Sequence, residues 1–169
     1  MKAKARIKLE IAPPDDADSI ADLRNATAAK LTAEFGEGPW SGTVTHKGVL
    51  FAMRVGTVLV VRRRAKIIAT LTLSTKKPWA IDTKYFTPAK KPLYLTAMAV
   101  AIDRQRTGIG RLCVEAARKL CKDWPVDAIR LDAYNATAGA GPFYEKCGFK
   151  EVGRASYRQT PLVYYEMLL

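Results

Sequence analysis

The segment that most constrains the fold is a nearly continuous apolar run at residues 93–100, followed closely by a turn and an amphipathic helical pattern. An apolar run of this kind, without alternation, is typical of a strand that is covered on both faces of a sheet. We therefore expect a central strand that leads through a turn at residues 101–107 into a helix. The apolar face of that helix recurs at every third or fourth position: Ile109, Leu112, Cys113, Ala116, Ala117, Leu120 and Cys121.

Shorter patterns on both sides of this unit predict the remaining elements. We expect an α/β (α+β) chain with a mixed sheet of about seven strands and about four helices, forming one domain over residues 1–169. The expected strands, besides the central one, lie at residues 7–11, 58–61, 67–73, 129–133, 149–157 and 162–168. The other expected helices include residues 20–31, 44–54 and 141–147, and an extended loop is expected at residues 76–91.

The chain carries a large excess of positive charge. Its 169 residues include 28 lysines and arginines against 16 aspartates and glutamates, which gives a formal net charge of +12. An anionic ligand or surface is drawn to such a chain at modest salt. Nucleotides, nucleic acids and membranes all carry that sign, so charge alone does not choose among them.

Cysteine usage and hydropathy exclude several classes of protein. The three cysteines lack metal-ligand spacing and only one histidine is present, so we expect neither a metal site nor a disulfide framework. Residues 1–11 alternate basic and apolar side chains and lack the apolar block of a signal peptide. The mostly apolar stretch at residues 93–102 is about half of the ~20 residues that a membrane-spanning helix needs. We therefore expect a soluble cytoplasmic protein without a membrane partner.

Glycines and arginines surround the expected start of the helix after the central strand. The first backbone N–H groups of a helix lack internal partners and, together with the helix dipole, attract anions. Gly108 and Gly110 would let this backbone approach a diphosphate closely, although Gly-x-Gly also occurs in ordinary turns before closely packed helices. Dinucleotide-binding and P-loop folds do not fit, because Cys113 replaces the third glycine and no Gly-Lys-Ser/Thr follows. Three cations beside the turn favour a polyphosphate: Arg104, Arg106 and Arg111.

Two motifs follow one another in a recognisable order. The first is Gln105-Arg106-Thr107-Gly108-Ile109-Gly110. The second is Asn135, followed by Phe143-Tyr144-Glu145-Lys146-Cys147-Gly148-Phe149. Together they resemble the Gln/Arg-x-x-Gly-x-Gly/Ala pyrophosphate loop and the later Asn…Tyr-Glu-Lys-x-Gly-Phe signature of the GCN5-related N-acetyltransferases, the GNAT family. The resemblance covers residues 93–149 well and the flanking segments in element order only.

The resemblance implies a sheet whose central parallel strands, residues 93–100 and 128–134, splay apart to admit acetyl-coenzyme A as the acyl donor. It implies that backbone groups of Met98, Ala99 and Val100 bind the pantetheine arm. It further implies a pyrophosphate loop made of Gln105, Arg106, Thr107, Gly108, Ile109, Gly110 and Arg111, with Asn135 and Tyr144 from the second motif near the cosubstrate. Asn135 and Tyr144 lie farther apart than in the family pattern, which predicts a longer loop between them and leaves the role of Asn135 open.

The implied reaction is direct transfer of an acetyl group to an amine acceptor. The family places a tyrosine where Tyr144 stands, and a phenol with a pKa of about 10 can protonate a departing thiolate. Tyr144 is therefore the candidate acid, with simple packing beside Phe143 as the alternative. A backbone N–H near Val100 is the candidate donor to the thioester carbonyl.

The base is less defined by the sequence. Asp132 ends a strand beside the splay and is the candidate base, whereas a water relay or an amine that arrives neutral would need no dedicated residue. His46, the only histidine, lies beside Lys47 without a paired acid, so we expect it to have a surface role. The alternative carboxylates are Asp103, Glu34 and Glu37.

Acceptor recognition is expected from the first two helices, the loop at residues 36–42, which is a candidate lid, and the segment at residues 79–86. A small-molecule or peptide amine of neutral or acidic character suits a basic chain better than a polycation does. The aromatic side chains that could line this site, or could instead cover the edge of the core, are Trp40, Trp79, Tyr85 and Phe86.

Two other functions remain open from the sequence. The charge would suit a nucleic-acid-binding module, but there is no helix-turn-helix, zinc or RNA-recognition signature, so nucleic acid is not the expected partner. A non-catalytic acyl-coenzyme A sensor could use the same fold. The closing strands could cap a monomer or join a homodimer.

Overall fold

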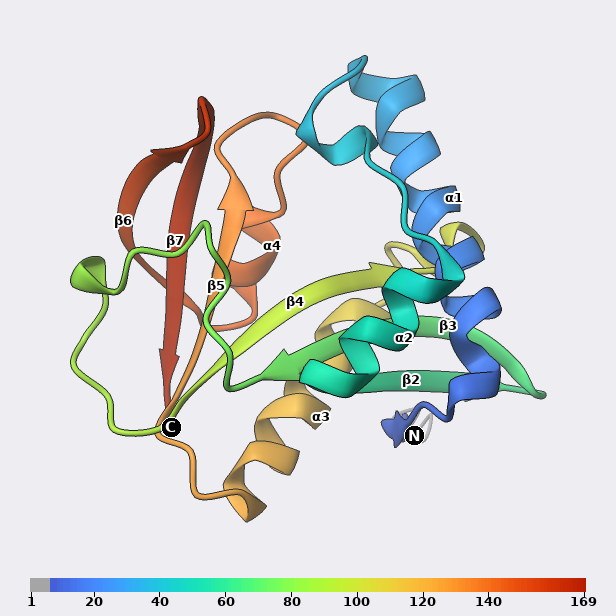
Figure 1. Cartoon of the computed structure of the whole chain (residues 1–169), viewed down its shortest axis with the longest axis horizontal. Helices are drawn as coiled ribbons and strands as arrows, with labels where there is room; N and C mark the ends of the chain where they lie inside the picture. The colour runs from blue at the N-terminus through green and yellow to red at the C-terminus, as the bar shows by residue number, and fades with distance from the viewer. Residues whose placement is uncertain (1–6) are drawn as a thin grey trace, which may run out of the picture.

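The computed structural model describes residues 7–169 and contains one mixed sheet of seven strands with four α-helices (Figure 1). The α/β class and the number of elements confirm the sequence prediction. The strands are β1 (Glu10–Ile11), β2 (Thr57–Arg63), β3 (Lys66–Ser74), β4 (Pro92–Val100), β5 (Ala128–Tyr134), β6 (Lys150–Tyr157) and β7 (Thr160–Leu168), in the sheet order β1-β2-β3-β4-β5-β7-β6. The helices are α1 (Ala17–Phe35), α2 (His46–Val55), α3 (Ile109–Asp123) and α4 (Gly141–Lys146).

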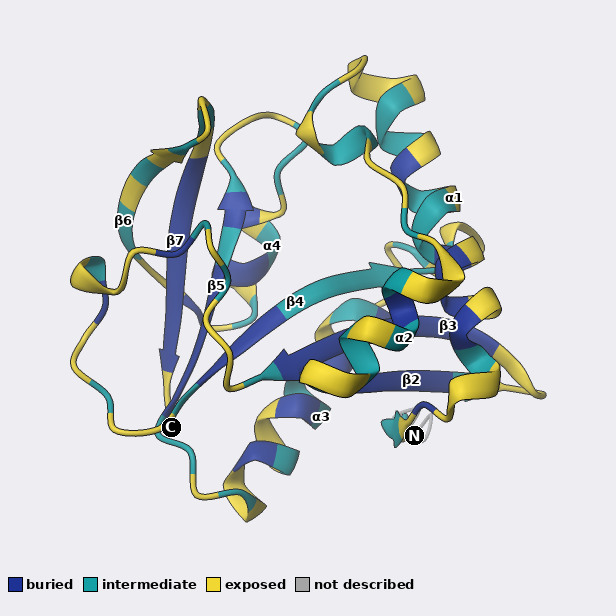
Figure 2. Ribbon diagram, viewed as in Figure 1, coloured by how far each residue is buried: buried dark blue, intermediate teal, exposed yellow. Residues whose placement is uncertain are grey.

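The two faces of the sheet carry different helices, because successive side chains of a strand point to opposite faces. Leu59 and Val61 of β2 belong to a core cluster with residues of α3 and α4. Val58 and Val60 of the same strand belong to a second cluster with residues of α1 and α2. Figure 2 shows β2, β3, β5 and β7 as mostly buried, the second half of β4 as intermediate, and the outward surface of α2 as largely exposed. The sheet thus separates an α1/α2 layer from an α3/α4 layer.

The segment between β3 and β4, residues 75–91, covers part of the sheet without forming an α-helix, as the sequence predicts. Its Ile81 and Phe86 are buried in a third cluster with Tyr94 of β4 and Tyr164 of β7. In Figure 1 this green segment runs in front of β5 and β7. The segment therefore lies on the same face of the sheet as α1 and α2. It covers one half of that face, and the two helices cover the other half.

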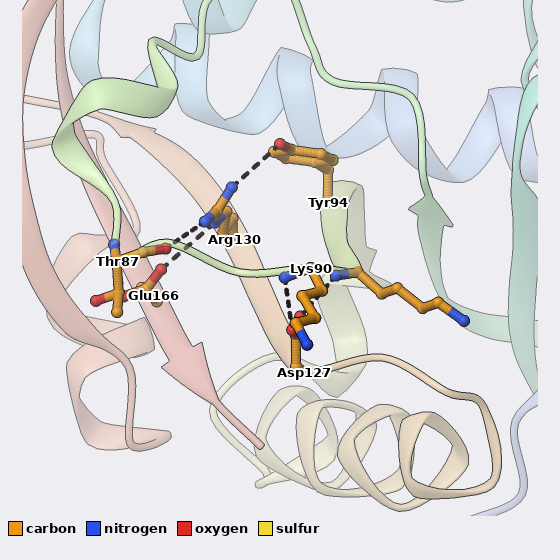
Figure 3. A network of polar contacts seen from close by, with 7 residues as sticks. Thr87, Lys90, Tyr94, Asp127, Arg130 and Glu166 are labelled. Carbon is orange, nitrogen blue, oxygen red and sulfur yellow. Dashed lines mark hydrogen bonds and ion pairs between the residues drawn. The ribbon is translucent and has the colours of Figure 1, made fainter.

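Polar contacts fasten this segment to the sheet (Figure 3). The Arg130 guanidinium donates to the carbonyl of Thr87 at 2.6 Å and lies 3.4 Å from the carboxylate of Glu166. Asp127 accepts hydrogen bonds from the backbone N–H groups of residues 90 and 91, at 2.7 and 3.0 Å. The Arg130–Glu166 pair is almost fully buried, with side chains 5% and 4% exposed. Its integrity therefore affects how the whole segment packs.

The two central strands separate, as predicted. β4 and β5 pair in parallel only where Pro92, Leu93 and Tyr94 lie opposite residues 128–130. β4 also contains an irregularity, because Ala97 has a φ of 52° and the register with β3 shifts at this level. A bulge of this kind bends a strand. The opening between β4 and β5 lies toward the carboxyl ends of both strands.

Helix α3 has the predicted amphipathic packing, with a buried face that includes Ile109, Cys113 and Cys121. Gly108 precedes the helix with a φ of 87°, a left-handed conformation that glycine adopts without steric cost. Burial raises the pKa of the Cys113 thiol to about 12 and that of Cys121 to about 11. Both thiols stay protonated at neutral pH and act as small apolar side chains.

The N-terminal strand is shorter than the predicted strand at residues 7–11. Only Glu10 and Ile11 pair with β2, while Ile7 and Leu9 pack against the core outside the ladder. If the pairing of β1 with β2 continued beyond Glu10, it would run beside residues 61–62 of β2. At these residues the register of β2 with β3 shifts. Within residues 7–169, no helix is both long and apolar enough to cross a membrane.

Candidate active site

A cavity of about 460 Å³ lies where β4 and β5 separate. Its walls come from α1, the loop that follows α1, the irregular part of β4 and the end of β5. Tyr144 of α4 also lines the cavity, although it belongs to the core cluster on the opposite face of the sheet. The cavity therefore reaches through the splay and joins the two layers.

The edge of β4 that faces the splay carries backbone N–H groups that β5 does not pair. The N–H of Ala101 donates to the carbonyl of Ile68 in β3 at 2.8 Å. Since N–H groups alternate between the two edges of a strand, those of Val100 and Met98 point toward the splay, where β5 no longer pairs with β4. The N–H and carbonyl of Ala99 point toward β3, so they are not available at the splay. Ala99 nevertheless lines the cavity. Two of the three residues predicted to bind the pantetheine arm therefore present free N–H groups.

The turn into α3 leaves its backbone N–H groups available. Within the described part of the chain, no N–H from residue 106 to residue 111 donates a hydrogen bond to a carbonyl or side chain. Arg106, with a φ of 59°, and Gly108 both have left-handed backbone conformations, as in the turns that form anion-binding concavities. Gly110 lets α3 approach α4, because a Cβ there would lie 3.1 Å from the Phe143 ring. The side chains of Arg104, Arg106 and Arg111 are exposed around this turn.

The remaining residues of the predicted loop are anchored through their side chains. The Thr107 hydroxyl donates to the carbonyl of Arg104 at 2.6 Å, and Ile109 is buried in the core. The Gln105 amide donates to the carbonyl of Val100 at 3.1 Å and accepts from Lys30 of α1 at 2.8 Å. These three residues can therefore contact a ligand chiefly through their backbone, and Gln105 ties the turn to the end of β4.

Tyr144 is buried beneath the cavity. Its ring has edge-on contacts with two phenylalanines, with centroid separations of 5.1 and 5.6 Å, and its hydroxyl lies 3.8 Å from the sulfur of Met98. Burial is the main reason that the pKa of Tyr144 is raised well above its usual value, and the charges of Cys147 and Asp132 act in the same direction. The phenol therefore keeps its proton and can donate it to a stronger base.

Asp132 lines the same cavity from β5. In the chain as described, its carboxylate forms no ion pair or hydrogen bond with another residue. Burial raises the pKa of Asp132 above its ordinary value. Its negative charge in turn raises the pKa of Tyr134 and of Tyr144, with burial the larger cause for both. Such a carboxylate accepts a proton more readily than an exposed one.

The alternative bases lie outside the cavity. Glu34 and Glu37 are exposed, and Asp103 lies 3.6 Å from the neighbouring Arg104. His46 is on the surface, but the prediction that it lacks a paired acid is wrong, since its Nδ1 lies 2.8 Å from Asp18. The packing of α1 against α2 brings these two residues together across 28 positions of sequence.

The loop at residues 36–42 lies beside the end of β5 (Figure 1), and its residues Pro39, Trp40 and Gly42 line the cavity. The Tyr134 hydroxyl donates to the carbonyl of Pro39 at 3.2 Å, and the Trp40 ring meets the Tyr134 ring at 5.9 Å. Trp40 thus lines the cavity as expected. For Tyr85 and Phe86 the alternative holds, since both pack on Tyr164 at the edge of the core. Trp79 does not line the cavity either and is 83% exposed.

Asn135 lies outside the cavity. It is exposed, and its backbone N–H donates to the carbonyl of Pro161 at 3.0 Å. The loop between it and α4, residues 136–140, reaches the cavity through Ala138 and Ala140 instead.

Several polar residues of the cavity escaped the sequence analysis, and two of them have side chains without a partner in the described part of the chain. These two are Arg24 of α1 and Thr96 of β4. The spacing of apolar residues in α1 identifies the buried face of the helix. It does not reveal which basic side chain beside that face points into a cavity. Thr96 stands inside an otherwise apolar strand, which is the one signal that could have drawn attention to it.

Comparison with known proteins decides the family. The sequence model of the Acetyltransferase (GNAT) family matches residues 25–149, which is most of the chain. The chain belongs to the GNAT acetyltransferase family. The match includes the splayed strands, the turn into α3 and Tyr144. No curated protein matches the chain in sequence.

Solved structures show the same GNAT fold. An acetyltransferase from Listeria monocytogenes is 20% identical with a TM-score of 0.73, and the alignment covers 96% of this chain and 95% of that one. A protein from Streptococcus mutans is 19% identical with a TM-score of 0.73, covering 95% and 98%. The ribosomal-protein-S18-alanine N-acetyltransferase of Escherichia coli is 14% identical with a TM-score of 0.69, covering 96% and 93%. At these identities the likeness concerns the fold alone.

Proposed function

We propose that this GNAT protein transfers an acetyl group from acetyl-coenzyme A directly to an amine acceptor. The observation that supports this most strongly is that three features adjoin: unpaired N–H groups at the start of α3, N–H groups of β4 that β5 does not pair, and a cavity that reaches Tyr144 and Asp132. Gln105 connects the turn to the end of β4, and Gly110 lies beside Met98, which lines the cavity. A long ligand with a phosphate-rich end and a reactive end would match this arrangement.

The residues present fit acetyl-coenzyme A as the acyl donor. The free N–H groups at residues 106–111 and three exposed arginines suit its pyrophosphate. The N–H groups of Met98 and Val100 suit the amides of the pantetheine arm and the thioester carbonyl. When bound, acetyl-coenzyme A supplies an activated acyl group on a thiol leaving group.

The protein residues have complementary roles in the proposed reaction. Asp132 accepts the proton that the attacking amine loses, and its raised pKa suits this role. Tyr144 supplies a proton to the departing thiolate. Burial keeps this phenol protonated at neutral pH, but its raised pKa makes it a weaker acid than a free phenol. A backbone N–H of β4, that of Val100 or Met98, stabilises the charge that develops on the carbonyl oxygen.

An amine acceptor suits the other side of the cavity. Two solved neighbours, from Escherichia coli and Brucella melitensis, are ribosomal-protein-alanine N-acetyltransferases, so proteins of this fold include enzymes that acetylate an amine. In this chain, α1 and the loop at residues 36–42 leave room for an acceptor beside Asp132.

A thermal-shift titration followed by a thiol-release assay tests this proposal. We expect acetyl-coenzyme A and coenzyme A to raise the melting temperature in a saturable way, since a ligand that binds only the folded state stabilises it. A short duplex DNA should not do so at physiological salt. We then expect amine-dependent release of free thiol. Stabilisation by the DNA alone, with no effect of either coenzyme A form, would contradict the proposed function.

A further inference from the structure

Most polar side chains that line the cavity already have partners within the protein. The Asn25 side chain exchanges two hydrogen bonds with the backbone of Val44, each of 2.9 Å. These groups are therefore unavailable to a ligand without loss of an internal contact. The other engaged side chains are those of Thr27, Trp40, Tyr134 and Tyr144.

Three polar side chains of the cavity are left over. Arg24 and Asp132 form no ion pair or hydrogen bond through their side chains within residues 7–169, and neither does the hydroxyl of Thr96. Arg24 stands on α1 and Asp132 on β5, and both line the cavity. The cavity therefore presents one free cation and one free anion.

Arg24 is a partly buried cation without a counter-charge. Burial lowers its pKa, and no negatively charged neighbour opposes that effect. The raised pKa of Asp132 likewise arises from burial, with no contribution from Arg24. The two groups are therefore not an ion pair. A buried charge without a partner is costly, and a ligand of opposite charge relieves that cost.

We propose that the acceptor is an amine that also carries a carboxylate, which Arg24 binds while the amino group lies at Asp132. This inference rests on the proposed function, because it takes Asp132 as the group that receives the amine. A guanidinium offers two parallel N–H groups that match a carboxylate. A dianionic phosphate fits less well, because Arg24 is the one free cation among the described residues that line the cavity.

Free amino acids and peptides with a terminal carboxylate near the amine share this chemistry. The test compares a panel of L-amino acids with their carboxamides, and adds dipeptides as a separate arm to distinguish the two sources. The carboxamide keeps the amine and the side chain but removes the anion. The measurements are kcat/KM by thiol release with acetyl-coenzyme A, and binding to the coenzyme A-loaded protein by thermal shift.

We expect the wild-type protein to favour carboxylates over the matched carboxamides. Replacement of Arg24 by glutamine (Arg24→Gln) should reduce kcat/KM for the carboxylates about 10- to 100-fold, which is the usual effect of losing a hydrogen bond to a charged group. The same replacement should leave the carboxamides nearly unchanged. Arg24→Lys should lie between the two, since it keeps the charge but not the paired donors.

Arg54→Gln is the matched control. Arg54 lies on α2 over the Phe51 ring and does not line the cavity, so this change removes one positive charge elsewhere. It should leave the preference for carboxylates unchanged. Unchanged stabilisation of Arg24→Gln by acetyl-coenzyme A shows that the variant is folded and that donor binding is intact.

Two contrary results are distinguishable. If acetyl-coenzyme A binds but the panel shows no preference for acid over amide, in binding and in turnover, the role of Arg24 is wrong and the proposed function stands. If wild type and Arg24→Gln prefer carboxylates over carboxamides to the same extent, the role of Arg24 is likewise wrong and the proposed function stands. If acetyl-coenzyme A itself fails to bind, the proposed function fails and this inference with it.

Discussion

Burial raises the pKa of two side chains that line the same cavity. Tyr144 and Asp132 both have raised pKa values, and desolvation is the larger cause for each. A raised pKa keeps the proton on the phenol, whereas it makes the carboxylate a better proton acceptor. Burial thus strengthens Asp132 as a base, whereas it keeps Tyr144 protonated and makes it a weaker acid than a free phenol.

The first prediction at the residue scale concerns the phenol. Tyr144→Phe removes one oxygen and keeps the ring contacts with the neighbouring phenylalanines. We expect kcat to fall about 100-fold, the lower end of what acid catalysis contributes. Stability and the affinity for acetyl-coenzyme A should change little. Steady-state kinetics at saturating donor measures this, and an unchanged kcat would leave Tyr144 with a packing role only.

The second prediction concerns the pH dependence that Asp132 produces. Below its pKa the carboxylate is protonated and cannot accept a proton, so kcat/KM should fall as the pH drops through a value above the ordinary Asp pKa of about 3.9. Asp132→Asn should remove this limb and reduce the rate at neutral pH. A pH–rate profile that is the same in both proteins would exclude Asp132 as the base.

The same shift has a consequence for stability. Because the pKa of Asp132 is raised in the folded state, the carboxyl contributes stability below its unfolded pKa and loses it as the pH rises through its folded pKa. At neutral pH the buried charge therefore lowers stability. Asp132→Asn should melt at a higher temperature than wild type at pH 7, measured by calorimetry, with a smaller difference in acid. A variant less stable than wild type at pH 7 would contradict this assignment.

At the scale of elements, the start of α3 depends on the backbone conformation of one glycine. Gly108 has a φ of 87°, and a Cβ at this position would meet no atom within 4 Å. Gly108→Ala should therefore lower the free energy of unfolding by about 1 kcal/mol through backbone strain alone. Gly108→Asn should lower it less, because asparagine tolerates this conformation better. Denaturant unfolding measures both, and equal stability of all three proteins would show that the turn readily adopts another conformation.

Elements with strong local patterns could be predicted from the sequence, and contacts between distant elements could not. The spacing of apolar residues predicts α3, and the apolar run predicts β4. The bulge at Ala97 leaves no mark in a run where every residue is small or apolar. The pairing of His46 with Asp18 depends on how two helices cross, which neither helix determines alone.

The same distinction applies to the residues of the candidate site: those whose role depends on local backbone conformation could be predicted, and those whose role depends on distant contacts could not. The motif predicts the turn at residues 105–111 because its function depends on backbone conformation, which glycine positions reveal. Arg24 was missed because its role depends on what faces it across the cavity. The role of the aromatic residues at 79–86 stayed open because composition does not tell whether a loop covers a cavity or the edge of the core.

At the scale of the whole molecule, the buried Arg130–Glu166 pair links the segment at residues 75–91 to β5 and β7 (Figure 3). The guanidinium also lies 5.0 Å from the centre of the Phe86 ring. Glu166 in addition accepts from the backbone N–H of Thr87 at 3.3 Å. The pair therefore serves several contacts that hold one layer onto the sheet.

Removal of one member of this pair should be costly. Arg130→Met leaves the carboxylate of Glu166 buried without a counter-charge, and we expect a loss of about 3–5 kcal/mol in the free energy of unfolding. The double variant Arg130→Met/Glu166→Leu should recover a large part of that loss, because no buried charge remains. Denaturant unfolding of both proteins tests this. A single variant as stable as wild type would show that the pair is not needed for packing of the segment.

A crystal structure with acetyl-coenzyme A bound tests the account most directly. The account predicts the pyrophosphate within hydrogen-bond distance of N–H groups between residues 106 and 111. It also predicts the thioester in the opening between β4 and β5, next to Tyr144. A cosubstrate bound elsewhere on the protein, with those N–H groups free and β4 and β5 in contact along their length, would contradict it.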